Sequence, residues 1–178
     1  MLVNTYRSYV MTKSNIIILF ISSGLFAVTI ALGSLLNPDS LSNQEFIEPA
    51  SFWGLFENNL IVCLILASGL FFLGIPTLIY LAMNGLIVGL AIKQHVNNGM
   101  SNWEVFLKLA PHGVLEIPAL LLAGVIGFKG LHILIELFVT SKKFIPLIKE
   151  HLVSIFCIGS KVIIFLFFAA LIEWYVTY

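Results

Sequence analysis

Apolar runs long enough to cross a lipid bilayer constrain the fold of this chain more than any other feature. A transmembrane helix needs about 20 predominantly apolar residues, and such runs recur along the 178 residues. Hydrophobic residues make up 60% of the sequence and charged residues only 10%, whereas soluble domains carry about 25% charged residues. The mean hydropathy is +1.04. These values predict an all-α, polytopic transmembrane helical bundle in the cell membrane, with about five spans and short interfacial helices.

The first third of the chain divides by polarity. Residues 1–14 form a short polar lead, and residues 15–36 form a first span that is too long for a secretory signal and has no matching cleavage site. Residues 37–57 contain four carboxylates and no Lys or Arg, which predicts an exterior acidic loop. Within this loop, residues 44–56 mix aromatic side chains with carboxylates, so we expect an interfacial helix with Trp53 as its anchor.

The remainder, residues 58–178, is expected to hold four spans, at residues 58–73, 75–92, 110–128 and 152–178, with an interfacial helix at 131–150. The first two of these are short and meet at a Gly-Ile-Pro turn, so the pair either spans with a tilt or forms a re-entrant hairpin. Gly85 and Gly89 form a G-x-x-x-G pattern, which lets helices approach closely but also arises by chance in apolar helices.

Basic residues set the predicted orientation. With a cytoplasmic N-terminus, most of them fall on the cytoplasmic side: Arg7, Lys13, Lys129, Lys142, Lys143 and Lys149. The C-terminus is then exterior. The net charge is zero and no basic run suggests nucleic-acid binding. Cys63 and Cys157 lie far apart inside apolar runs, so we expect both to be packing residues of the core.

The stretch Pro-His-Gly-Val-Leu-Glu-Ile-Pro at residues 111–118 is the main candidate for function. His112 and Glu116 are four residues apart and therefore share one face of a helix. Ionisable groups inside a bilayer are costly and are kept where they pair, line a cavity or bind something. Small residues continue the same face, which indicates contact with protein, and Pro118 predicts a kink just past Glu116.

The predicted topology brings further polar residues to the depth of this pair. We therefore predict one intramembrane polar cluster of Asn58, Asn84, His112, Glu116 and Glu173. Within it, His112, Glu116 and Glu173 are the candidate ligands of a divalent metal ion, and a structural His–Glu pair that satisfies itself is the alternative. The remaining histidines, His95, His132 and His151, lie in or beside polar segments and receive no role. No catalytic residue is assigned.

The same residues resemble those of a known family. The pattern of Asn58, Gly74-Ile75-Pro76, Asn84-Gly85, Pro111-His112-Gly113 with Glu116, and Ile172-Glu173 resembles the stage II sporulation protein M family over residues 52–178. The resemblance implies a helical, multi-span bacterial or archaeal membrane protein. The founding member works in forespore engulfment, where it holds peptidoglycan-degrading partners at the septal membrane. Related proteins accompany genes for circular bacteriocin secretion and immunity.

Three functions are compatible with this sequence. A non-enzymatic membrane scaffold or accessory component is favoured, because the chain has no nucleotide-binding loop and no G-x-S-x-G. The lipid bilayer, a membrane or cell-envelope protein and a second copy of the chain are the expected partners. The alternatives are a metal-dependent intramembrane enzyme using His112, Glu116 and Glu173, and a transport or immunity component whose buried carboxylates relay protons or bind a peptide.

Overall fold

A computed structural model describes residues 12–36, 51–140 and 144–177, and these form five helices with no strand among them. The helices are α2 (Lys13–Leu35), α3 (Phe52–Ser68), α4 (Ile75–Asn97), α5 (Asn102–Val139) and α6 (Phe144–Thr177). All except α3 contain a segment long and apolar enough to cross a membrane. The predicted all-α membrane bundle is therefore confirmed. Most of the predicted lead of residues 1–14 and most of the predicted acidic loop lie outside the described residues, as do residues 141–143 of the predicted interfacial helix.

Local signals in the sequence fix where the helices begin. The hydroxyls of Thr12 and Ser51 accept backbone hydrogen bonds at the starts of α2 and α3, and Gly74 adopts a left-handed φ of 83° before α4. Ser101 and Glu104 form a reciprocal capping box at the start of α5. The hydrogen bonds that Ser101 donates hold the pKa of the Glu104 carboxyl below its usual value.

Two predicted boundaries differ from the structure. Residues 52–56 were expected in an interfacial helix, but they are the first turn and a half of α3, where Phe52 packs edge-on against Phe167 of α6 with ring centroids 5.5 Å apart. The interfacial helix expected at 131–150 is instead divided between the end of α5 and the start of α6. Its polar residues face one another across these two helices, which removes the reason to expect a separate helix at the membrane surface.

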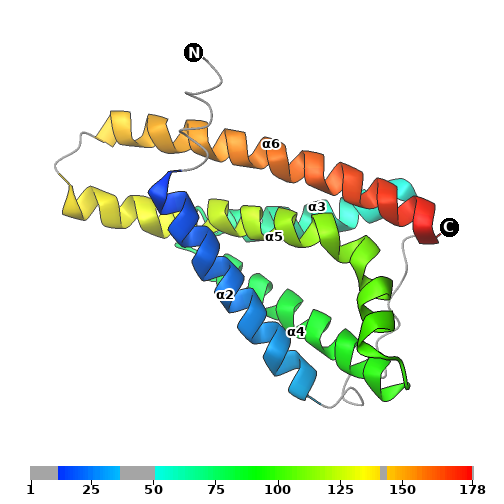
Figure 1. Ribbon diagram of the computed structural model, residues 1–178. Helices are drawn as coiled ribbons and strands as arrows, with labels where there is room; N and C mark the ends of the chain where they lie inside the picture. The colour runs from blue at the N-terminus through cyan, green and yellow to red at the C-terminus, as the bar shows by residue number, and fades with distance from the viewer. Residues whose placement is uncertain (1–11, 37–50, 141–143, 178) are drawn as a thin grey trace.

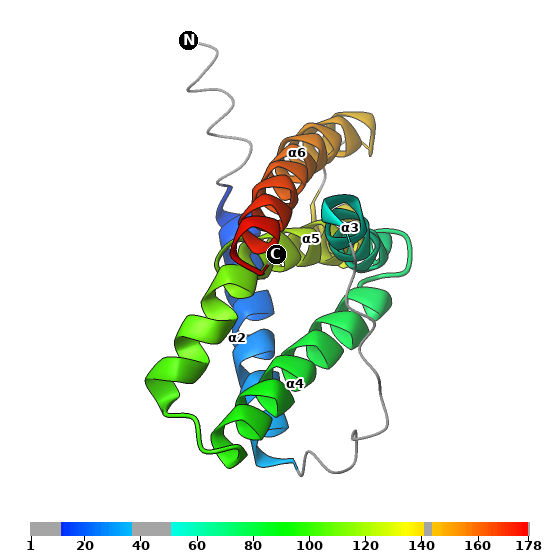
Figure 2. The ribbon, with the colours of Figure 1, turned by 90° about the vertical axis from the view of Figure 1, so that its right-hand side faces the viewer.

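The ribbon shows α3, the longer part of α5 and α6 lying together, with α2 and α4 crossing beneath them (Figures 1 and 2). Helix α5 bends sharply where its colour passes from green to yellow-green in Figure 1. Pro111 and Pro118 both lie inside this helix, and a proline in a helix removes one backbone donor and frees a carbonyl. The bend separates a short first arm from the long second arm that enters the bundle.

Glycines allow the closest helix crossings. A Cβ atom on Gly85 would overlap Thr29 of α2, and one on Gly89 would overlap the backbone carbonyl of Ile30. The predicted G-x-x-x-G contact face is therefore confirmed, with α2 as its partner. On α5, a Cβ atom on Gly127 would overlap the Leu66 carbonyl of α3, and one on Gly130 would overlap the Leu70 carbonyl of the α3–α4 turn.

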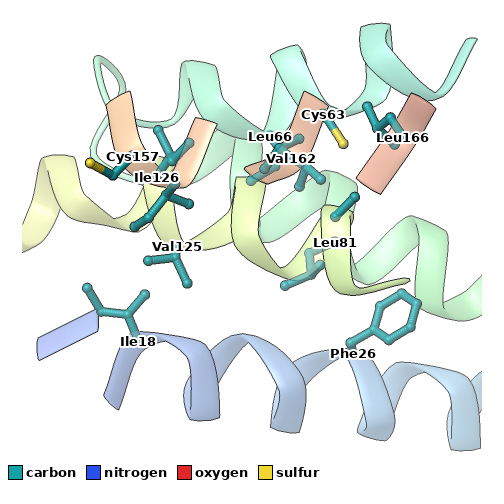
Figure 3. Close-up of a cluster of buried hydrophobic side chains, with 13 residues drawn as sticks. Ile18, Phe26, Cys63, Leu66, Leu81, Val125, Ile126, Cys157, Val162 and Leu166 are labelled. Atoms are coloured by element: carbon teal, nitrogen blue, oxygen red, sulfur yellow. The ribbon is translucent and has the colours of Figure 1, made fainter. Parts of the chain in front are cut away.

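All five helices contribute to one apolar core. Figure 3 shows its side chains, with Ile18 and Val125 at one end of the view, Phe26 and Leu81 at the other, and Leu66 and Cys63 beside Val162 of α6. Both cysteines are free and buried, as predicted for core packing. The buried hydroxyl of Thr77 donates to the Leu66 carbonyl at 2.7 Å and so ties α4 to α3 inside this core.

Candidate functional site

Ionisable side chains lie at two ends of the bundle. One end combines the start of α3, the bend of α5 and the last turns of α6, and it holds the predicted Glu116 and Glu173. The other end combines the start of α2, the end of α5 and the start of α6, whose residues line one cavity of about 450 Å³.

At the first end, Glu116 is held by α3. The side-chain amide of Asn59 donates a hydrogen bond to Glu116 Oε1. The residue predicted for this role was the adjacent Asn58, whose side chain is exposed. One helical position rotates a side chain by 100°, which is enough to move it from a protein contact to the outer face.

The other members of the predicted cluster are placed as follows. Glu173 is 8% exposed and lies near the end of α6. The Asn84 amide donates to the Tyr80 carbonyl of its own helix at 2.7 Å. The backbone of His112 belongs to α5, but its side chain lies outside the described part. The five-residue cluster, and a metal ion held by His112, Glu116 and Glu173, therefore stay predictions.

The second end contains a His–Glu–His group that the sequence analysis did not select. His132 and Glu136 are four residues apart on α5, and their Nε2 and Oε2 atoms are 3.6 Å apart. His151 on α6 places its Nε2 atom 3.1 Å from the same Glu136 oxygen. The two imidazole rings meet edge to face, with centroids 5.7 Å apart. Two imidazoles from different helices thus converge on one carboxylate oxygen.

A buried charge lies beside this group. Lys129, one turn before His132 on α5, is only 1% exposed, although the sequence analysis placed it on the cytoplasmic surface. Its ammonium is attracted by the carboxylates of Glu150 and Glu136. An isolated charge is costly to bury, and two nearby carboxylates offset that cost.

Helix α2 closes the site from a third side. The buried Asn15 amide donates to Ser154 Oγ of α6 at 3.0 Å, one turn beyond His151. Thr12, Lys13 and Ser14 line the cavity together with His132, Glu136 and His151. The site is therefore built where the starts of α2 and α6 meet the end of α5. The two imidazoles and the carboxylate line the same cavity.

The donor set suits a transition metal. Two imidazole nitrogens and one carboxylate oxygen are the three protein ligands of one common class of zinc centre, in which the fourth position stays open. The three donor atoms lie within 4.8 Å of one another. The three side chains can also hydrogen-bond to one another, since a neutral imidazole donates to a carboxylate through one ring N–H.

Comparisons with known proteins agree with this architecture. The profile of the stage II sporulation protein M family matches residues 16–178. An uncharacterized protein of Methanocaldococcus jannaschii is 31% identical over 144 residues, which is 81% of this chain and 80% of that protein. No solved structure matches the chain.

Proposed function

The chain belongs to the stage II sporulation protein M family, and from this premise we propose that it is a non-enzymatic scaffold or accessory protein of the cell membrane. Its role is to hold a membrane or cell-envelope protein in place. The lateral faces of the bundle provide the contact, and the polar groups at its two ends stabilise the helices that carry those faces.

One observation supports this proposal above the alternatives. Within the described ranges, the longest stretches outside helices are residues 69–74 and 98–101. Ordinary catalytic sites are commonly carried by loops on a rigid scaffold, and the described chain offers two short turns for this purpose. A protein whose described residues are almost all in packed, membrane-length helices is suited to binding another protein within or beside the bilayer.

We further propose that the N-terminus is cytoplasmic. The start of α2, the end of α5 and the start of α6 form one end of the bundle, and this end contains Lys13, Lys129 and Lys149. Because basic residues near span ends favour the cytoplasmic side, this end faces the cytoplasm. The end with Glu116 and Glu173 then faces outward.

Site-specific photocrosslinking in intact cells tests the scaffold role. A photoreactive residue at the exposed Phe20 of α2 or Phe156 of α6 should capture one and the same envelope protein. The same residue at the fully buried Leu66 is the control and should capture none. Deleting the chain should lower the amount of that protein in the membrane fraction, and restoring the wild-type chain should raise it again.

Two outcomes oppose the proposal. Adducts formed only with a second copy of the chain would indicate a homo-oligomer without a separate partner. Ion or solute flux through the purified protein in liposomes would favour a transport role.

A further inference from the structure

We propose that His132, Glu136 and His151 bind one divalent transition-metal ion, with Zn²⁺ as the best fit, and that this ion fastens the end of α5 to the start of α6. The inference does not depend on the scaffold function. It assigns a ligand to residues for which the sequence predicted no role.

The donor separations carry the proposal. Ligand atoms about 2.0–2.1 Å from a tetrahedral ion lie about 3.3 Å apart. The separations from Glu136 Oε2 are 3.6 Å to His132 Nε2 and 3.1 Å to His151 Nε2, one on either side of that value. All three donors lie within 4.8 Å of one another, so the three side chains must close on an ion by rotation of the imidazole rings.

The choice of metal follows from the ligand types. Imidazole nitrogen suits zinc and its neighbours in the transition series, whereas Ca²⁺ and Mg²⁺ prefer sites made of oxygen alone. Three protein ligands leave a fourth position open, and the three side chains line a cavity of about 450 Å³. Water or a polar group that lines the cavity can provide the fourth ligand.

The charges nearby permit a cation. Lys129 repels it, but the Glu150 carboxylate faces the same cavity and offsets that charge. Glu136 then supplies the negative charge of the site, and both imidazoles bind as neutral ligands.

The position of the site in the helices gives ions a route to it. Helix α6 has 34 residues and is therefore about 51 Å long, whereas the hydrocarbon core of a bilayer is about 30 Å thick. Glu136 lies within one turn of the end of α5 and His151 within two turns of the start of α6, so a helix longer than the core can place the site at the aqueous interface. An ion can reach the three donors without crossing the apolar core.

Metal titration of the full chain in detergent tests the proposal. Protein stripped with a chelator is titrated with Co²⁺ and then with Zn²⁺. We expect one equivalent of Co²⁺ with the intense visible absorption of a tetrahedral site, displaced by one equivalent of Zn²⁺. The thermal midpoint should rise with added Zn²⁺.

Variants identify the ligands. His132→Ala, Glu136→Gln and His151→Ala should each weaken binding at least 10-fold, the smallest effect that even an outer-shell partner of a metal site usually has. His95→Ala, on α4 and outside the group, is the matched control and should bind like the wild type. If an alanine variant fails to fold, Glu136→Gln decides, because it keeps the size of the side chain and one acceptor oxygen while removing the charge.

The proposal is overturned by a wild type that binds less than one equivalent, by the weak absorption of a six-coordinate Co²⁺ site, or by a Glu136→Gln protein that binds as tightly as the wild type. Equal losses in the His95→Ala control would also overturn it. None of these results bears on the photocrosslinking of a partner, so the two proposals fail separately.

Discussion

Asn59 on α3 donates a hydrogen bond to Glu116 on α5, a residue 57 positions further along the sequence. This bond stabilises a half-buried carboxylate beside the bend of α5. A charged acceptor makes such a bond stronger than one between neutral groups.

Replacing Asn59 by Leu should therefore destabilise the bundle. The expected loss is about 1–3 kcal/mol, because Glu116 loses a donor in a partly buried place. Equilibrium unfolding in mixed detergent micelles measures it. Asn58→Leu is the matched control, since its exposed side chain should change stability by less than about 0.5 kcal/mol. Equal effects of the two substitutions would show that the bond contributes nothing.

A second prediction concerns the crossing of α2 and α4. Gly89→Ala places a methyl group on the Ile30 carbonyl, so the helices must separate, at an expected cost of about 1–3 kcal/mol. The control is Gly24→Ala on α2, where nothing lies within 4 Å of the added Cβ. There the gain in helix propensity should leave stability unchanged or raise it by up to about 1 kcal/mol. Both substitutions add the same methyl group. A difference in the sign of the stability change must therefore come from the packing around the two glycines.

The crossing of α2 and α4 was predictable in part, because the spacing of Gly85 and Gly89 within one helix is a local property of the sequence. Its partner, α2, was not predictable, since the glycine pattern does not say which helix approaches. The choice between Asn58 and Asn59 shows a related difficulty. The two amides are adjacent and chemically identical, so hydrophobicity alone does not decide which of them faces the protein, and the position of Glu116 decides it.

The His–Glu–His group shows which part of a site the local spacing of residues can predict and which part it cannot. His132 and Glu136 repeat the four-residue spacing of His112 and Glu116, so this half of the site was visible in the sequence. His151 joins it through the alignment of α6 beside α5, which depends on packing along both helices. Assigning residues 131–150 to the membrane surface hid the relationship, because a surface helix needs no partner for its polar residues.

A third prediction concerns orientation. Single cysteines at Asn98, in the α4–α5 turn, and at Ser141, between α5 and α6, should be labelled from opposite sides of the membrane by an impermeant thiol reagent. Only Ser141 is expected to react from the cytoplasmic side. The natural Cys63 and Cys157 are buried and provide the unlabelled background. Labelling of both positions from one side would contradict a crossing of the membrane by α5, and reversed sidedness would contradict the cytoplasmic N-terminus.

The last prediction addresses Lys129, whose side chain is buried while that of Glu150 is exposed. Lys129→Met keeps the length of the side chain and removes the charge, and Glu150→Gln removes one of the charges that attract it. Each single change should destabilise the bundle, whereas the double variant should lose less than the sum of the two. Contacting residues in one charge network usually couple by about 0.5–3 kcal/mol, and equilibrium unfolding of the four proteins of the cycle measures this value.

Lys129→Met with Glu57→Gln is the control cycle, because Glu57 lies in α3 and is not among the carboxylates that attract Lys129. A coupling no larger than that of the control would mean that Lys129 is accommodated by its aliphatic stem alone, and that the carboxylates at this end of the bundle leave its burial unchanged.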